Sequence, residues 1–129
     1  MALPIRHAPV LEGAAASRFE KESLQQSIYE IVRLIPHGRA TSYGAIAKAA
    51  GYPNFSRLVG KIMSQCPADA GIPAHRVVDS QGRLSAKDAF GAPGQMQKLL
   101  ESEGIVVVND KIQNWKRVFW DPMMEIRIF

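Results

Sequence analysis

The spacing of apolar residues predicts that the folded part of the chain begins with two amphipathic helices. The first is predicted over 22–35, where apolar residues recur every three or four positions and a Pro-His-Gly sequence follows. The second is predicted over 42–50, with Thr41 or Ser42 as its N-cap and Gly51 just past its end. These start and stop signals indicate a helical first half of the domain.

A third helix, predicted over 55–66 with Asn54 as its cap, has two different faces. Its apolar face consists of Phe55, Leu58, Val59, Ile62, Met63 and Cys66. A second face, small, basic and hydroxylated, consists of Arg57, Gly60, Lys61 and Ser64. Two short helices joined by a tight turn, the second with such a face, are typical of a helix-turn-helix. A glycine here costs about 1 kcal/mol of helix propensity against alanine, which either close helix packing or close approach of a sugar-phosphate backbone would explain.

The second half of the chain mixes short elements. A strand is predicted over 75–79, an extended segment over 83–85 and a helix over 94–103. Residues 105–108 and 111–113 flank an Asn-Asp pair and predict a small hairpin. The apolar residues expected to close the core are Trp115, Val118, Phe119 and Trp120. The predicted fold class is mainly α with a small β component, a winged helix-turn-helix-like domain.

Length and composition limit the chain to one globular domain. It has 129 residues, of which 47% are hydrophobic and 22% charged. We expect a flexible tail or tag at 1–20, the domain at 21–121 and a C-terminal tail at 122–129. The single cysteine excludes an internal disulfide and a thiolate zinc cluster, and no apolar run approaches the roughly 18 residues of a membrane span.

Charge is concentrated in the middle of the chain. The net charge is +4, yet residues 31–87 contain eight bases and only two acids, Asp69 and Asp79. A cationic middle favours an anionic partner, with nucleic acid first. The alternative is a solvated basic surface on an ordinary basic protein.

Four motifs occur in consistent order over about 24–108. They are the run Ile-Pro-His-Gly-Arg-Ala-Thr-Ser-Tyr-Gly-Ala-Ile-Ala that starts at Ile35, Ser-Arg-Leu-Val-Gly at 56–60, Ile-Pro-Ala-His-Arg-Val at 72–77 and Leu-Leu-Glu-Ser-Glu-Gly at 99–104. Together they resemble the C-terminal domain of O6-alkylguanine-DNA alkyltransferases. The resemblance implies binding in the DNA minor groove and flipping of a damaged guanine into a pocket.

The chain departs from those enzymes at the position that carries the reaction. Ala74 stands where their alkyl-accepting cysteine belongs, and alanine has no nucleophilic atom. His75 and Glu103 match the two partners of that cysteine. This departure, and the absence of a matching amino-terminal domain, resemble the alkyltransferase-like proteins. That resemblance implies a non-enzyme without cofactor or metal, which binds O6-alkylguanine without dealkylating it and passes the lesion to nucleotide excision repair.

The resemblance also implies a set of DNA-contacting residues. These are Ser42, Tyr43, Ala45, Arg57, Gly60, Lys61 and Ser64. Arg57 matches the arginine finger that fills the gap left by the extruded base; otherwise it is an exposed or phosphate-contacting arginine. Tyr43 matches the tyrosine that presses on the phosphate beside the flipped nucleotide; otherwise it is a core residue.

A second implied set lines the lesion pocket. It comprises Met63, Ala74, His75, Arg76, Val77, Leu84 and Lys87. The apolar members are equally plausible core residues, and we hypothesise that Ala74 leaves room for groups larger than methyl. Lys87 matches a cation placed over the flipped base or is a surface lysine. His75 contacts the base or is a structural histidine bonded to Glu103.

Three rival interpretations remain open. In the first, the chain is an alkyltransferase domain whose acceptor cysteine was mutated to alanine. In the second, it is a helix-turn-helix regulator that recognises a DNA sequence in the major groove. In the third, Cys66 is a displaced acceptor, which its place on the apolar stripe disfavours. The partners we expect are double-stranded DNA with O6-alkylguanine and nucleotide-excision-repair proteins, with the chain a monomer away from membranes. It would be cytoplasmic and nucleoid-associated in a bacterium, or nuclear in a eukaryote.

Overall fold

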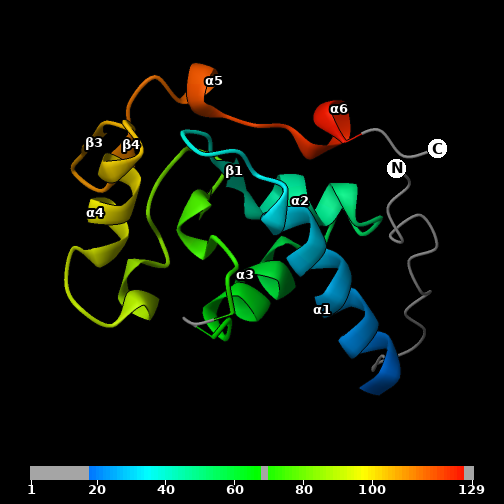
Figure 1. Ribbon diagram of the computed structural model, residues 1–129. Helices are drawn as coiled ribbons and strands as arrows, with labels where there is room; N and C mark the ends of the chain where they lie inside the picture. The colour runs from blue at the N-terminus through cyan, green and yellow to red at the C-terminus, as the bar shows by residue number, and fades with distance from the viewer. Residues whose placement is uncertain (1–17, 68–69, 127–129) are drawn as a thin grey trace.

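One long helix, several short helices and four two-residue strands make up the described part of the chain (Figure 1). The structure, a computed structural model, describes residues 18–67 and 70–126. In chain order the elements are α1 (Arg18–Arg33), β1 (Thr41–Ser42), α2 (Tyr43–Ala49), α3 (Ser56–Ser64), the 3-10 helix η2 (Ala74–Arg76), β2 (Val77–Val78), the 3-10 helix η3 (Lys87–Phe90), α4 (Gln95–Ser102), β3 (Val107–Val108), β4 (Lys111–Ile112), α5 (Trp115–Val118) and α6 (Pro122–Glu125). The predicted class, mainly α with a small β component, is confirmed.

The helix-turn-helix forms where the capping residues predicted it. Ser42 is the N-cap of α2, and its side chain accepts a hydrogen bond of 3.1 Å from the Ala45 N–H. Gly51 follows the end of α2 with a φ of +94°, a conformation that glycine adopts without strain. Helices α2 and α3 then pack against each other as a pair.

The start of α3 differs from the prediction. Phe55, not Asn54, occupies the N-cap position, and no side chain caps the helix. The Phe55 N–H donates to the Tyr52 carbonyl at 3.0 Å, and the two rings lie 5.2 Å apart. Aromatic packing within the turn therefore sets the start of α3. Rules based on N-capping side chains do not take such packing into account.

The predicted strand over 75–79 is also shorter than expected. Ala74–Arg76 form η2 instead, with the Arg76 N–H bonded to the Pro73 carbonyl at 3.0 Å, and only Val77 and Val78 are a strand. The strand β2 pairs in parallel with β1, with Thr41 opposite Val77 and Ser42 opposite Val78. The predicted hairpin forms as the antiparallel pair β3–β4.

Two hydrophobic cores lie on opposite sides of β2. Val77 belongs to the core formed by α1, α2 and α3, which also contains Trp120. Val78 belongs to the core formed by α4 and the hairpin, together with Leu84. Successive side chains of a strand point to opposite faces, so these two adjacent valines join the two halves of the domain.

The C-terminal segment is attached to the residues that precede β1. The Ala40 N–H donates to the Val118 carbonyl at 3.2 Å, and the Trp120 N–H donates to the Ala40 carbonyl at 2.7 Å. Residues 122–129 were expected to be a tail, but Pro122–Glu125 form α6, which packs on α2. Asp121 caps α6 by accepting a hydrogen bond of 3.0 Å from the Met123 N–H. The expected tail at 1–20 lies outside the described residues, except that α1 already begins at Arg18.

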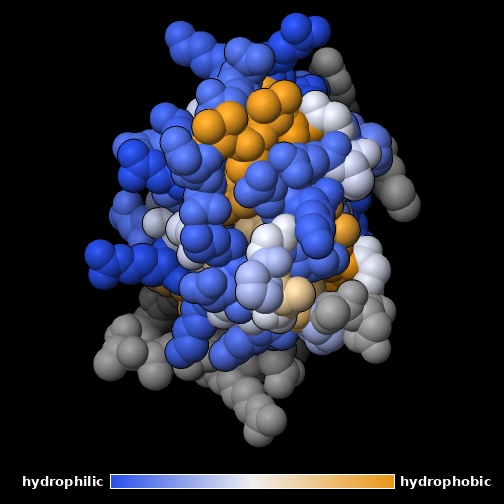
Figure 2. Space-filling model, turned by 90° about the vertical axis from the view of Figure 1, so that its left-hand side faces the viewer, coloured by the Kyte–Doolittle hydropathy of each residue, from blue (hydrophilic) through white to orange (hydrophobic). Residues whose placement is uncertain are grey.

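The surface around α4 and the hairpin is mostly hydrophilic. Figure 2 looks at this side of the molecule and shows one compact hydrophobic patch on it. In the hairpin region Val106 and Val108 are 57% and 49% exposed. Among the described residues, no helix is long and apolar enough to cross a membrane.

Candidate nucleic-acid interface and adjoining cavity

The polar face predicted for the third helix is exposed on α3. Arg57, Lys61 and Ser64 are exposed, whereas Val59 and Met63 on the other side are buried. The Ser64 hydroxyl donates to the Lys61 carbonyl at 2.7 Å, so part of its hydrogen-bonding capacity is used within the helix. The amphipathic arrangement predicted from the sequence is therefore present.

Gly60 lies on this face next to Tyr43. A Cβ atom at position 60 would lie 3.9 Å from Tyr43 Cδ1, an ordinary van der Waals distance. Packing between α2 and α3 therefore does not require a glycine here. The geometry therefore does not support close helix packing as the reason for this glycine, and close approach of a sugar-phosphate backbone stays a prediction.

Tyr43 joins the helix-turn-helix to the turn after β2. Burial raises the pKa of its phenol, a hydrogen bond with Ser85 acts in the opposite direction, and the charge of Asp79 adds to the increase. The hydroxyl consequently stays protonated at neutral pH and can act as a donor. Tyr43 is half-buried against the first core, so it combines a packing role with a polar tip.

An open cavity of about 770 Å³ lies between α3, η2, η3 and α4. Its walls include Met63, Ala74 and His75 from the predicted pocket, and they are mostly small or apolar. Among the residues that the structure describes, which leave out 68–69, the lining contains no lysine, arginine, aspartate or glutamate. The space beside Ala74 therefore suits a planar, uncharged group with an apolar substituent.

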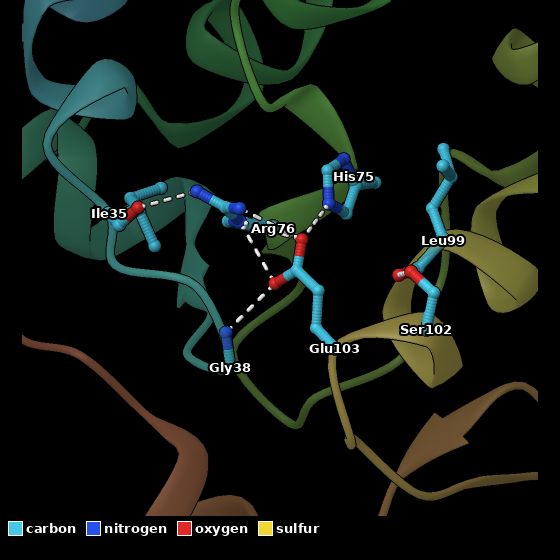
Figure 3. Close-up of polar contacts among 7 residues, drawn as sticks. All are labelled: Ile35, Gly38, His75, Arg76, Leu99, Ser102 and Glu103. Atoms are coloured by element: carbon cyan, nitrogen blue, oxygen red, sulfur yellow. Dashed lines mark hydrogen bonds and ion pairs between the residues drawn. The ribbon is translucent and has the colours of Figure 1, made fainter.

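Glu103 connects the wall of this cavity to three other segments (Figure 3). Its Oε2 lies 2.6 Å from His75 Nε2, Arg76 binds both of its oxygens at 2.9–3.1 Å, and its Oε1 accepts from the Gly38 N–H at 2.9 Å. Arg76 Nη1 also donates to the Ile35 carbonyl at 2.7 Å. The network fixes η2, α4 and the loop after α1 relative to one another.

The ionisation of Glu103 follows from these contacts. Burial alone would raise the pKa of its carboxyl group, but hydrogen bonds from Arg76, His75 and Gly38, together with the charge of His75, lower it to about 2. Its side chain is only 6% exposed. The carboxylate is therefore ionised throughout the physiological pH range.

Other residues of the predicted pocket lie elsewhere. Val77 and Leu84 are 1% and 2% exposed and belong to the two cores. Arg76 is engaged by Glu103 and the Ile35 carbonyl. Lys87 is 2.6 Å from Asp110 in a half-exposed ion pair, and this contact is the main cause of its raised pKa. The structure thus brings three of the seven predicted pocket residues together around one cavity.

The cavity also includes residues that sequence reasoning did not assign to it. Phe90 and Leu99 line one side, and Cys66 lies in the wall contributed by the end of α3. Burial raises the pKa of the Cys66 thiol, which leaves little thiolate at neutral pH. For Leu99 the available signal was its four-residue spacing from Glu103, which would place both on one side of the helix predicted over 94–103.

Comparison with known proteins agrees with this geometry. Residues 23–105 match the family described as 6-O-methylguanine DNA methyltransferase, DNA binding domain. A DNA base-flipping protein from Vibrio parahaemolyticus is 39% identical over 95 residues, covering 74% of this chain and 93% of that protein. Alkyltransferase-like protein 1 from Schizosaccharomyces pombe is 30% identical over 99 residues, covering 74% and 92%.

Solved structures give the same result. The S. pombe alkyltransferase-like protein, crystallised with damaged DNA containing O6-carboxymethylguanine, has a TM-score of 0.70 at 30% identity, covering 77% of this chain and 95% of that one. The Mycobacterium tuberculosis alkyltransferase in complex with DNA has a TM-score of 0.53 at 28% identity, covering 77% and 60%. The chain belongs to the family of 6-O-methylguanine DNA methyltransferase DNA-binding domains, and its predicted resemblance to alkyltransferase-like proteins is confirmed.

Proposed function

We propose that this protein binds duplex DNA, extrudes an O6-alkylguanine and holds it in the cavity without removing the alkyl group. The observation that carries the proposal is Ala74 in the cavity wall, next to an intact His75–Glu103 pair. The partners of a nucleophile are present and the nucleophile is replaced by a methyl group. Relatives named DNA base-flipping protein and alkyltransferase-like protein support this function.

The exposed face of α3 would make the first contact with DNA. Arg57 and Lys61 supply charge for phosphates, and Gly60 lets the backbone approach closely. The Arg57 guanidinium is planar, so it fills the space left by the extruded base and stacks on its neighbours. Tyr43, with its protonated hydroxyl, is placed to donate to the phosphate of the flipped nucleotide.

Extrusion of a base costs a few kcal/mol, and the cost is lowest for a weakly paired lesion. In the cavity the O6 substituent would lie against Ala74 and Met63, in a wall whose described residues include no lysine, arginine, aspartate or glutamate. An alanine occupies less space than a cysteine, so we expect substituents larger than methyl to fit as well.

The bound lesion would keep its alkyl group because the cavity offers no activated nucleophile to accept it. Alanine has no lone pair, and the thiol of Cys66 has a raised pKa. A bound but unrepaired lesion is useful only if another system removes it. We therefore infer that the complex recruits nucleotide-excision-repair proteins, and that the protein acts as a monomer in the compartment that contains the DNA.

The decisive experiment compares two duplexes that differ by one O6-methyl group, titrated at one fixed salt concentration. The radiolabelled methyl group is followed in the same samples. We expect tighter binding to the lesion with the label retained on the DNA. Equal affinity for both duplexes would contradict lesion recognition, and label on the protein would contradict the absence of transfer.

An Arg57→Ala variant sharpens this test. Loss of the inserted side chain should remove most of the preference for the alkylated duplex, because the extruded state is no longer stabilised. The matched control is Lys98→Ala, which removes an exposed cation from α4, outside the cavity wall. A preference that survives in Arg57→Ala would assign Arg57 to the alternative role of a simple phosphate contact.

A further inference from the structure

Three cations gather in the C-terminal part of the chain, beyond the family match that ends at residue 105. Lys111 on β4 and Lys116 and Arg117 on α5 line an open hollow of about 650 Å³. Its lining also includes Ser80 and Trp115, and it contains no acidic residue. We call this hollow, defined by these five residues, the basic hollow.

None of the three cations is neutralised within the part of the chain that the structure describes. The ion pairs there join Glu103 to His75 and Arg76, and Lys87 to Asp110. Lys111, Lys116 and Arg117 are all exposed. Among the described residues, the basic hollow thus presents three positive charges without an ion-pair partner.

The indole of Trp115 gives the basic hollow a fixed wall. Its Nε1 donates to the Ser80 carbonyl at 3.2 Å, and its ring lies 5.3 Å from that of Phe119. A Cβ atom at Gly82 would come within 3.1 Å of the ring, so the turn after β2 lies directly against the indole. The neighbouring cations at 116 and 117 are consequently held in place on a short, packed helix rather than on a loose tail.

The basic hollow continues into the predicted DNA-contacting surface. A second hollow of about 590 Å³ shares Ser80 and Trp115 with it and extends to Ser42 and Ala45 at the start of α2. Its one acidic residue, Asp121, is occupied in capping α6. The hydrogen bonds between Ala40 and Val118–Trp120 keep α5 at a constant position relative to β1 and α2.

We propose that the basic hollow binds the phosphodiester backbone of the same DNA duplex, at phosphates that flank the lesion. This inference rests on the proposed DNA binding and extends it. Three unpaired cations beside an open hollow match a row of phosphates in charge, and their continuity with the α2 surface favours DNA over an acidic protein partner. The contacts would be independent of base sequence and of the lesion.

The test compares two double variants that remove the same charge. Lys116→Gln/Arg117→Gln changes the basic hollow, and Arg33→Gln/Lys98→Gln changes exposed cations of α1 and α4 that line neither hollow. Each phosphate contact contributes about 0.9 to the slope of log Kobs against log salt concentration, so we expect the first variant to reduce the slope by about 2. Its affinity should fall equally for alkylated and unmodified DNA, with the ratio of the two unchanged.

A chemical change in the DNA gives an independent readout. Single phosphates of the duplex are replaced in turn by neutral methylphosphonates. At phosphates that flank the lesion, the replacement should weaken DNA binding by the wild-type protein and by Arg33→Gln/Lys98→Gln. It should not weaken DNA binding by Lys116→Gln/Arg117→Gln. The inference would be overturned if both double variants had the same slope of log Kobs against log salt concentration. It would also be overturned if no methylphosphonate position weakened binding by the wild-type protein without weakening binding by Lys116→Gln/Arg117→Gln. A wild-type protein without lesion preference would contradict the proposed function instead, so the two failures are distinguishable.

Discussion

The cavity wall at Ala74 and the carboxylate network at Glu103 lie side by side, but the first is mostly apolar and the second is polar. The wall is mostly small and apolar, and its described residues include no lysine, arginine, aspartate or glutamate. The network is polar, and the Glu103 carboxylate receives hydrogen bonds from three residues. The network is complete although the residue that it would activate in an enzyme is absent.

This difference separates two functions of one sequence motif. Ala74, His75 and Arg76 are consecutive. Ala74 belongs to the cavity wall alone, Arg76 belongs to the network alone, and His75 lines the cavity while it binds Glu103. The network is intact with alanine at position 74, because it connects the loop after α1, η2 and the end of α4. In this protein the carboxylate network has a structural role, whereas a binding role is proposed for the cavity.

The largest effect should come from removing the centre of the network. Glu103→Ala leaves Arg76 without its carboxylate partner in a site where its side chain is 16% exposed. Removing one partner of a buried pair costs about 3–5 kcal/mol, and we expect a loss near the lower end. Urea unfolding measures it. Glu101→Ala on the exposed side of α4 is the control and should change stability by less than about 0.5 kcal/mol; equal losses would contradict the network's structural role.

Acid should weaken the protein through the same carboxylate. The pKa of Glu103 is about 2 in the folded protein, below its usual value, so its contribution to stability is complete at neutral pH. That contribution should decline as pH falls from the ordinary glutamate range, about 4.3, toward 2. Glu103→Gln should flatten this part of the curve of unfolding free energy against pH. An unchanged curve in the variant would mean that other carboxylates cause the acid sensitivity.

Filling the cavity should affect binding and leave the network intact. Ala74→Leu places a larger side chain where the alkyl substituent is proposed to lie. We expect the preference for alkylated over unmodified DNA to fall about tenfold, or about 1.4 kcal/mol, with unfolding free energy little changed. Competition binding to the two duplexes measures the ratio. Ala70→Leu, outside the cavity lining, is the matched control. A similar fall in the preference for alkylated DNA in this control would contradict a specific role of the cavity wall at Ala74.

Local signals in the sequence predicted much of the fold. Ser42 caps α2, Gly51 and Gly104 follow helix ends, and the hairpin forms where an Asn-Asp pair separates two apolar runs. Each of these features depends on residues within a few positions of each other. The exposed face of α3 was predictable for the same reason, because helical periodicity alone separates Arg57 and Lys61 from Val59 and Met63.

The site was only partly predictable, because its geometry depends on distant segments. The resemblance implies that Val77 and Leu84 are pocket residues, but Val77 is buried in the core of α1, α2 and α3, and Leu84 in the core of α4 and the hairpin. Phe90 lines the cavity from the end of the short 3-10 helix η3, and the sequence around it has no periodic signal. The pairing of Lys87 with Asp110 joins residues 23 positions apart, which no local rule anticipates. The separation of the network from the cavity follows from a single turn of 3-10 helix at Ala74–Arg76.

The parallel pairing of β1 with β2 has a consequence for how the protein folds. Thr41 and Val77 are partners although 36 positions separate them, as the difference 77 − 41 gives. Strand β1 leads into the helix-turn-helix, and strand β2 directly follows η2, which forms part of the cavity wall. Contacts between distant parts of a chain form slowly, because the intervening loop must first be closed. The DNA-contacting surface and the cavity should therefore acquire their relative positions in one late step, so that a nascent or partly unfolded chain presents neither half of the site in a form able to hold a flipped base.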